Sequence, residues 1–308
     1  MAEGKINVAV VMSTYNGQRF LRKQIDSIMN QKRIAVSLYI RDDGSKDNTV
    51  SIIKKYKENN IHLIKGQNVG VGNSFMNCLY SAPRNFDYYC FADQDDIWDE
   101  DKISTAIDKI KDVMHPALYC SNQRLVDAEG NTIGHRYENG EKPDLRPMKI
   151  LNQNQATGCT MVWNRQLNEL LVDKKRRPSK ELLVKRIHDA WVAMVASVVG
   201  ELIYDKNAHI AYRQHENNVV GIRKENILKV WHEKLHNKSL RNGRSALATE
   251  IFSKYSDLND SQLMQHLEEI SMCKGLKSKV RLIQRGYIFG YSGESRLSIS
   301  LKVLIGLY

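Results

Sequence analysis

An apolar run at residues 88–91 ends abruptly in three carboxylates within four residues. These are Asp93, Asp95 and Asp96. A short apolar run of this kind predicts a buried strand, and carboxylates at its end stay ionised only where positive charge lies nearby. Asp93 and Asp95 point the same way in an extended segment, so they could share one oxygen-seeking divalent cation. The competing interpretation of an isolated Asp-x-Asp is a solvated acidic turn that caps a helix beginning near Asp99.

The composition is that of an ordinary globular protein. The chain has 308 residues, 42% of them hydrophobic, and no apolar run approaches the roughly 18 residues needed to cross a bilayer. Its start, Met-Ala-Glu-Gly-Lys, lacks the apolar core of a signal peptide, so we expect a cytoplasmic location. Five widely spaced cysteines without a Cys-x-x-Cys pair indicate reduced thiols, and neither a disulfide framework nor a zinc site.

The net charge of +11 predicts an anionic partner, which could be a nucleotide, a nucleic acid or a lipid headgroup. Most of the excess lies in residues 222–308, where 15 Lys and Arg stand against eight Asp and Glu. We expect three or four basic helices with apolar stripes there. In residues 274–285, basic and apolar side chains alternate, so this helix could lie on an anionic bilayer, pack on the rest of the protein, or form a dimer contact.

Strands and helices alternate over the first third of the chain. This alternation predicts an α/β fold with a mainly parallel central sheet flanked by helices. Ligands of such sheets bind beyond the carboxyl ends of the strands, so the polar turns that follow the strands should meet at one edge. The apolar runs that predict these strands are residues 7–13, 36–40, 61–64 and 88–91.

Three turns on this edge carry candidate binding residues. The first is Ser13-Thr14-Tyr15-Asn16, and the second is Arg41-Asp42-Asp43-Gly44-Ser45. The third, residues 66–72, has the pattern Gly-x-x-x-Gly-x-Gly, which is neither a Walker loop nor a dinucleotide fingerprint. Taken alone, the second turn could equally begin a helix.

The second half of the chain predicts a buried helix that opens at His188-Asp189-Ala190-Trp191. Capping that helix is the structural alternative for Asp189. The basic run at residues 174–178 is typical of a solvated loop, or otherwise of a clamp for anionic groups. Strands are expected at residues 118–120, 124–126, 157–163, 201–204 and 208–212, with a loop over residues 134–156.

Six short motifs occur in order between residues 6 and 221, and together they resemble the inverting family-two glycosyltransferases with the A-type nucleotide-sugar fold. The resemblance is nearest to bacterial rhamnosyltransferase-type members, which share the Asp-Gln-Asp-Asp-Ile-Trp, His-Asp-x-Trp and Tyr-Arg-Gln-His runs. The six motifs are Ser13-Thr14-Tyr15-Asn16, Arg41-Asp42-Asp43-Gly44-Ser45, Asn68-Val69-Gly70, Asp93-Gln94-Asp95-Asp96, His188-Asp189-Ala190-Trp191 and Tyr212-Arg213-Gln214-His215.

The resemblance implies a catalytic domain over residues 1–221 and a helical appendage over residues 222–308. It implies transfer of a sugar from dTDP-rhamnose, or from a UDP-sugar, to a saccharide acceptor that is often lipid-linked. Cell-surface polysaccharide synthesis at the inner face of the membrane is the expected process. A divalent cation, Mn²⁺ or Mg²⁺, is the implied cofactor, because it would stabilise charge that develops on the leaving diphosphate.

The resemblance also implies roles for individual residues. Asp93, Asp95 and His215 are implied metal or diphosphate ligands. His188, Trp191 and Trp98 are implied acceptor contacts, although many relatives carry Glu where this chain has His188. The implied nucleotide contacts are Thr14, Tyr15, Asn16, Asp42, Asp43, Asn68, Gly70 and Asp93.

Asp189 is the expected catalytic base. Inversion requires a base that takes the proton of the acceptor hydroxyl on the face of the sugar opposite the leaving diphosphate. The carboxylates of residues 93–96 lie on the expected metal side, and those of residues 42–43 belong to the nucleotide end. Asp189 instead begins a buried helix after a long polar loop, which would place its carboxylate at the mouth of the site.

Two other classes of protein share some of these features. A sugar-phosphate nucleotidyltransferase would have the same sheet and metal, but it should carry a glycine-rich basic signature after the first strand, where this chain has Thr14-Tyr15-Asn16-Gly17. A nucleic-acid-binding protein would account for the charge, yet it gives the acidic turn at residues 93–96 no purpose. We therefore expect no nucleic-acid partner.

Overall fold

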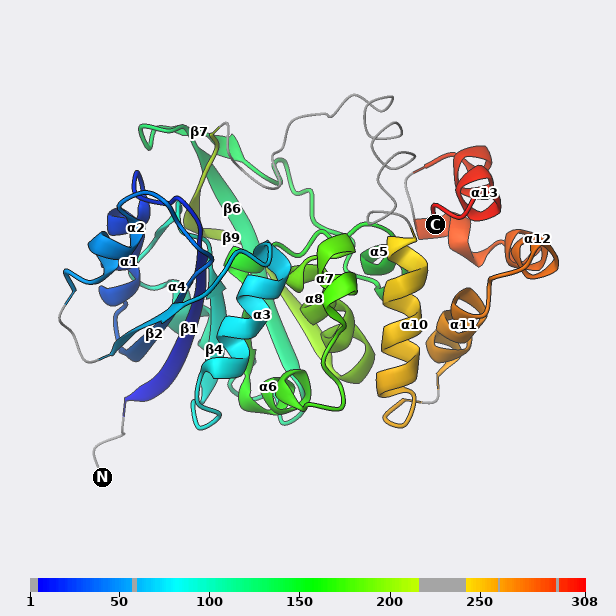
Figure 1. Ribbon diagram of the computed structural model, residues 1–308, viewed down its shortest axis with the longest axis horizontal. Coiled ribbons are helices and arrows are strands. Elements are labelled where there is room, and N and C mark those ends of the chain that lie inside the picture. Colours follow the sequence, from blue (N-terminus) through cyan, green and yellow to red (C-terminus); the bar gives the residue numbers. More distant parts are fainter. Residues whose placement is uncertain (1–4, 57–59, 216–241, 260, 292–293) are drawn as a thin grey trace.

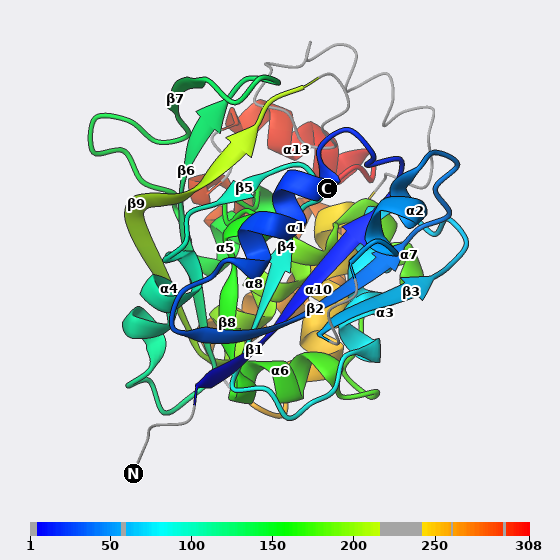
Figure 2. The same ribbon diagram turned by 90° about the vertical axis from the view of Figure 1, so that its left-hand side faces the viewer.

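The structure, a computed structural model, describes residues 5–56, 60–215, 242–259, 261–291 and 294–308. In this part of the chain, nine strands form one sheet with helices on both faces (Figures 1 and 2). The sequence-based predictions for residues 216–241, which include the first of the basic helices, lie outside the described residues.

The sheet has the strand order β3-β2-β1-β4-β8-β6-β9-β5, and β7 pairs with β6. The α/β architecture expected from the alternation of strands and helices is thereby confirmed. The strands are β1 (Ile6–Thr14), β2 (Ile34–Asp42), β3 (Ile61–Lys65), β4 (Tyr88–Ala92), β5 (Ile97–Trp98), β6 (Ala117–Val126), β7 (Thr132–His135), β8 (Val162–Asn164) and β9 (Glu201–Arg213).

The first four strands are parallel, as predicted. On β1, Val8 and Val10 pack on one face of the sheet, whereas Ala9 and Val11 pack on the other, and all four are fully buried. Burial on both faces explains why the run is apolar throughout and does not alternate with polar residues. Because β1, β2 and β4 are parallel neighbours, the turns that follow them lie at one edge of the sheet.

The other half of the sheet is mixed. β8 lies antiparallel between β4 and β6, and β9 lies parallel to β6. The predicted breaks within residues 118–126 and 201–212 are wrong, because each segment is one long strand. The register between β6 and β9 shifts opposite residues 205–208, where the Asp205 carboxylate accepts the N–H of Asn207 at 2.9 Å. The polar residues that suggested a turn therefore form a local irregularity inside a strand.

Two layers of helices cover the sheet. α1, α2 and α4 pack on one face, and the remaining helices build the core on the other face (Figure 1). The helices are α1 (Leu21–Met29), α2 (Thr49–Ile53), α3 (Val71–Ser81), α4 (Lys102–Ile110), α5 (Pro147–Asn152), α6 (Arg165–Val172), α7 (Lys180–Lys185), α8 (His188–Val199), α10 (Gly243–Tyr255), α11 (Gln262–Ser271), α12 (Leu276–Arg285) and α13 (Arg296–Leu304), with 3-10 turns at η1 (Gly158–Thr160) and η3 (Tyr287–Tyr291).

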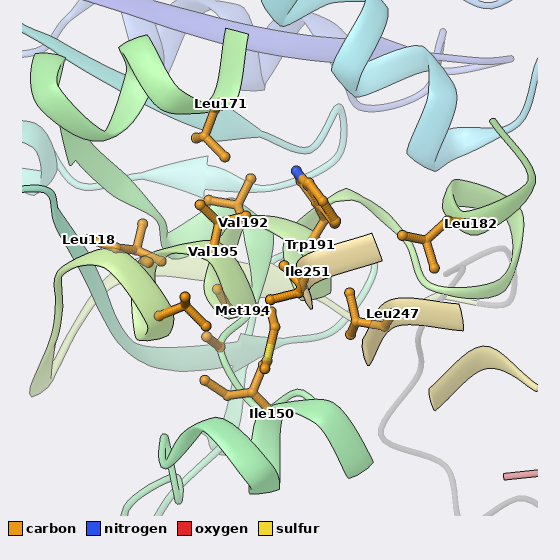
Figure 3. Packing of buried hydrophobic residues seen from close by; sticks show 14 of the residues in the cluster. Leu118, Ile150, Leu171, Leu182, Trp191, Val192, Met194, Val195, Leu247 and Ile251 are labelled. Carbon is orange, nitrogen blue, oxygen red and sulfur yellow. The ribbon is translucent and has the colours of Figure 1, made fainter. Parts of the chain in front are cut away.

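α8 is apolar nearly all round, and it is buried between the sheet and α10. Figure 3 shows Leu247 and Ile251 of α10 beside Trp191 and Met194 of α8. One hydrophobic cluster thus extends from the sheet into the C-terminal helices. The basic run at residues 174–178 helps to fix α10, because Arg176 forms a two-pronged ion pair with Asp257.

Replacing Ile251 by Ala should lower the free energy of unfolding of the whole protein by about 2–5 kcal/mol, since it leaves a cavity in this shared core. Urea unfolding followed by circular dichroism measures the change. The matched control is Leu258→Ala, because Leu258 is 46% exposed and its loss should shift the free energy by about 0.5 kcal/mol or less. If the variant lost stability only in a separate, minor unfolding transition, this would show that α10 unfolds independently of the sheet.

Candidate functional site

A cavity of about 930 Å³ lies at the carboxyl ends of β1, β2 and β4. Ten of the fourteen residues predicted from the sequence line it, and they come from six separate stretches of the chain. The four that do not line it are Thr14, Asp42, Trp98 and Trp191. The ten lining residues are Tyr15, Asn16, Asp43, Asn68, Gly70, Asp93, Asp95, His188, Asp189 and His215.

The acidic turn after β4 is fixed by Arg213, the last residue of β9. The backbone N–H of Arg213 donates to Asp96 Oδ1 at 3.1 Å, and its Nε donates to the carbonyl of Asp95 at 2.9 Å. The side chain is buried, and its Nη1 also reaches the carbonyls of Asp127 and Ala128. This arginine therefore joins three segments and sets the direction in which Asp93 and Asp95 face.

The structure brings His215 to Asp95, with 2.7 Å between His215 Nε2 and Asp95 Oδ2. Asp93 faces the same cavity, and burial, together with the nearby Asp95 and Asp189, raises its pKa to about 7. Asp96 lies deeper, and its Oδ2 is buried and has no hydrogen-bond partner among the residues that the structure describes. The turn thus brings together carboxylates whose negative charge is not balanced by nearby positive groups.

These residues fit a hard divalent cation. Carboxylate oxygens and one imidazole nitrogen form a donor set that suits Mg²⁺ or Mn²⁺. Ligand atoms of Asp93, Asp96 and Cys159 also lie within 4.8 Å of one another. However, burial raises the pKa of the Cys159 thiol far above its usual value, so it stays protonated and is a poor ligand. Asp93, Asp95 and His215 face the cavity, but among the described residues only the Asp95–His215 pair is in direct contact, so their sharing of one cation stays a prediction.

Two predicted nucleotide contacts hold a turn and do not reach the cavity. The Asp42 carboxylate accepts the backbone N–H groups of Gly44 and Ser45 at 3.2 and 3.0 Å, and the Thr14 hydroxyl donates to it at 3.3 Å. Both side chains are buried behind the cavity wall. The prediction of direct nucleotide contact is therefore wrong for Thr14 and Asp42 in this structure, because the carboxylate is engaged in the turn.

Asp43 does line the cavity, and it also fixes the glycine loop. Its carboxylate accepts the N–H groups of Val69 and Gly70 at 3.0 and 3.1 Å and forms an ion pair with buried Arg41. These amides point to Asp43 and not into the cavity. Gly70 has a φ of +83°, which only glycine adopts without strain, so the loop can turn into α3 here.

Gln94 connects the acidic turn to the turn after β1. Its side-chain amide accepts the N–H of Tyr15 at 3.0 Å and donates to the carbonyl of Tyr15 at 3.2 Å. Gly17 leaves room for this contact, because a Cβ there would lie 2.3 Å from Gln94 Oε1. The Tyr15 ring is 44% exposed at the cavity, so its face is free to contact a ligand.

His188 and Asp189 begin α8 and form another part of the cavity wall. Gly158 allows their close approach, since a Cβ there would lie 2.8 Å from His188 Nε2. The Asp189 carboxylate accepts the N–H of Ala190 at 2.6 Å. Burial raises its pKa to about 6, while this hydrogen bond and the charge of Arg186 act in the opposite direction. A carboxyl group with that pKa is mostly ionised at neutral pH and can still accept a proton.

His188 is a neutral group in this wall. Burial lowers its pKa to about 3, and its ring stacks on Phe75 with centroids 3.9 Å apart. Neither ring nitrogen has a hydrogen-bond partner in the described part of the chain. An uncharged imidazole in a cavity wall can donate from one nitrogen and accept at the other.

Arg186 supports this segment from behind. Its Nη2 donates to the carbonyls of Ile150 and Leu151, at 2.9 and 2.6 Å, at the end of α5. Arg244 of α10 reaches the carbonyl of Asn152 at 3.2 Å from the other side. The start of α8 is therefore tied to α5, and α5 is tied to the C-terminal helices.

Trp191 and Trp98 were expected to offer aromatic faces to an acceptor, and that prediction is wrong. Trp191 is fully buried among α8, α10 and the sheet, since its position on the helix faces the core. Trp98 is 3% exposed, and its ring covers the ammonium group of buried Lys102 at 3.7 Å. Neither residue lines the cavity.

The structure adds side chains that no sequence pattern indicated. Arg19 and Phe20 follow the first turn, and Phe20 stacks on His215 with ring centroids 5.2 Å apart. Arg136 and Asn154 line the cavity from the segment expected to be a loop. Arg136 and Arg19 bring positive charge to an otherwise acidic wall. No pattern marks these residues in the sequence, because single arginines in polar segments are common.

The chain matches the family model described as glycosyl transferase family 2 over residues 9–170, which is more than half of its length. It is 31% identical over 229 residues to dTDP-rhamnosyl transferase RfbG of Shigella flexneri, and the match covers 68% of this chain and 73% of that protein. It is 27% identical over 161 residues to the minor teichoic acid biosynthesis protein GgaA of Bacillus subtilis (strain 168), covering 48% of this chain and 34% of that protein.

The arrangement of elements is similar to that of S. aureus TarS. The structure of TarS residues 1–349 in complex with UDP-GlcNAc matches with a TM-score of 0.57 and 14% identity, over 97% of this chain and 82% of that chain. At this level of identity the likeness shows the fold alone. It confirms the A-type glycosyltransferase fold that the six motifs implied.

Asp189 should titrate near pH 6, where an ordinary aspartate titrates near pH 4. Carbon NMR of labelled aspartate carboxyl groups measures this, and Asp189→Asn identifies the signal by removing it. Arg186→Gln should raise the pKa of Asp189 further, because a nearby positive charge favours the ionised form. Lys185→Gln is the control and should leave it unchanged. An Asp189 signal that titrates near pH 4 would contradict the burial of this carboxyl group.

Proposed function

Because the chain belongs to glycosyl transferase family 2, it is a glycosyltransferase, and we propose that it transfers L-rhamnose from dTDP-rhamnose to a saccharide acceptor with inversion. The observation that carries the proposal is one cavity lined both by the acidic turn with His215 and by the separately held carboxylate of Asp189. The similarity to an S. flexneri dTDP-rhamnosyl transferase supports the donor.

In the proposed mechanism, the nucleotide occupies the part of the cavity formed by the turns after β1, β2 and β3. The exposed face of Tyr15 stacks on the pyrimidine, and Asn16, Asn68 and Asp43 are positioned to contact polar groups of the nucleotide. Gly70 keeps the wall open because it has no side chain. The hydrogen bonds of Asp42, Asp43 and Gln94 hold these turns in place before the donor arrives.

Asp93, Asp95 and His215 would hold the divalent cation beside the diphosphate. When bound, this cation supplies Lewis-acid stabilisation of the charge on the leaving group. Asp96 supports the turn through the N–H of Arg213 and stays behind the ligands. Arg19 and Arg136, which line the same cavity, add positive charge that attracts the anionic donor.

Asp189 is the proposed base. It accepts the proton of the acceptor hydroxyl while that oxygen attacks the anomeric carbon, and the diphosphate leaves from the opposite face of the sugar. His188 is proposed to orient the acceptor, because it lies beside Asp189 in the same cavity wall. The hydrogen bond from Ala190 and the support from Arg186 keep the Asp189 carboxylate in one position.

The acceptor is proposed to be a lipid-linked saccharide of a cell-surface polysaccharide. The relatives include a protein of teichoic acid biosynthesis, which supports a cell-surface glycan. No helix in the described residues is long and apolar enough to span a bilayer. A lipid-linked acceptor would be reached at the inner face of the cell membrane, and this is the proposed place of action of the enzyme as a peripheral protein.

Hydrolysis of candidate donors tests this proposal. With Mn²⁺ or Mg²⁺ present, dTDP-rhamnose should be cleaved faster than UDP-sugars, and a chelator should stop the reaction. Asp95→Asn should lose this metal-dependent cleavage while retaining its fold, because it removes a ligand oxygen from the turn. The similarity of fold to a protein crystallised with UDP-GlcNAc makes a UDP-sugar the second candidate. Preferential cleavage of a UDP-sugar would show that dTDP-rhamnose is not the donor. Full activity in excess chelator would show that the reaction needs no metal.

Asp189→Asn should slow transfer to a saccharide acceptor by about 10²- to 10⁴-fold, because the positioned base is lost. Binding of the donor should change little, since Asp189 lies apart from the nucleotide turns. In the wild type, kcat/KM should rise with pH up to about 6 and then level off, as the base becomes ionised. The profile is measured with saturating metal, which keeps Asp93 ionised throughout. Near-normal transfer by Asp189→Asn, or a product of retained configuration, would show that another group is the base.

A further inference from the structure

Exposed apolar side chains are concentrated on the last two helices and the residues next to them. The described residues have 13 large apolar side chains that are exposed, and seven of them lie between residues 272 and 305. This segment makes up about a ninth of the chain, so the concentration is far above an even spread. The seven are Met272, Leu276, Val280, Leu297, Leu301, Leu304 and Ile305.

α13 is apolar on two opposite faces. Ile299 and Val303 point inward and are buried. Leu297, Leu301 and Leu304 follow at the spacing of one helical face, and all three point outward, with Leu297 80% exposed. A surface helix normally keeps its outward face polar, so a second apolar face indicates that something covers it.

Basic residues surround this apolar surface. Residues 272–305 contain seven Lys and Arg, and Glu294 is their single acidic residue. Glu294 is already engaged by Arg244 and Lys302. The exposed side chains of Lys274, Lys277, Arg281 and Arg296 form no ion pair in the described part of the chain. The surface is therefore strongly positive as well as apolar.

α12 and α13 lie close together and can act as one surface. The ammonium group of Lys279 on α12 donates to the carbonyl of Leu304 on α13 at 2.8 Å. On α12, the apolar pair Leu276 and Val280 lies beside the basic pair Lys277 and Arg281, four residues apart in each case. Figure 1 shows both helices at the end of the molecule opposite α1 and α2.

We propose that the α12–α13 surface, defined by these exposed apolar and basic residues, docks on an anionic lipid bilayer. Apolar side chains enter the boundary between headgroups and acyl chains, while the surrounding cations contact lipid phosphates. A second copy of the chain fits less well, because a two-fold contact would place the same positive surface against itself. A nucleic acid would satisfy the charges but would leave the leucines exposed to water. The choice of a bilayer accords with the proposed lipid-linked acceptor but is argued from this surface alone.

Sedimentation with lipid vesicles tests this inference on the full chain. The protein should bind vesicles that contain phosphatidylglycerol and should bind pure phosphatidylcholine vesicles far less, with binding weakened by salt. Lys277→Gln with Arg281→Gln should lower partitioning about 30-fold, the effect of two near-surface charges. Leu297→Glu with Leu301→Glu should abolish binding. Met114→Glu is the matched control, because Met114 is 83% exposed outside this surface, and it should bind as the wild type does.

Two further measurements separate the alternatives. Light scattering reports the oligomeric state, and a wild-type dimer that becomes a monomer in Leu297→Glu with Leu301→Glu would overturn the inference in favour of a contact between copies. Equal binding to both kinds of vesicle would also overturn it. Transfer to a water-soluble saccharide should be unchanged in all surface variants. If the protein binds vesicles but transfers sugar from no donor, the inference about this surface holds and only the proposed function fails.

Discussion

Mutual repulsion among buried carboxylates is the constraint on which the site depends. Asp93 carries a raised pKa because it is buried and because Asp95 and Asp189 lie near it. Carboxylates in this situation separate or take up protons unless the backbone holds them and positive charge arrives. Arg213 holds the turn in place through its hydrogen bonds to Asp95 and Asp96. A ligand that brings a cation into this cavity would relieve the repulsion, which is the role proposed for the divalent metal.

Two of the six acidic motif residues, Asp42 and Asp96, do not line the cavity, and the hydrogen-bonding needs of the turns explain the position of Asp42. Turns at the end of parallel strands have exposed N–H groups that no neighbouring strand can satisfy. Asp42 satisfies two of them in its own turn, and Asp43 satisfies two in the glycine loop. Loss of Asp43 would also leave Arg41 buried without its ion-pair partner. These aspartates shape the end of the cavity proposed to hold the nucleotide, and of the two only Asp43 also lines the cavity.

The sequence was sufficient for the parallel half of the sheet and for most of the cavity, because alternation of strands and helices is a local signal and parallel strands end at one edge. Prediction from the sequence failed where the orientation of a side chain decides whether the residue lines the cavity. Trp191 belongs to a motif whose neighbour Asp189 faces the cavity, but two residues further along a helix the side chain points into the core. It also failed for Arg136, since a long polar segment gives no sign of which residue folds back to the site.

The C-terminal helices cannot be treated as a detachable anchor. α10 completes the core around Trp191, whereas α12 and α13 carry the exposed surface. Glu294 joins Lys302 of α13 to Arg244 of α10, and Arg244 contacts the carbonyl of Asn152 at the end of α5. Arg186 holds the same end of α5 and lies three residues before Asp189. Removing residues 222–308 would therefore disturb the core and the support of Asp189 together. Outward-facing side chains of α12 and α13 are the positions at which the proposed docking can be changed while the fold and the support of Asp189 stay intact.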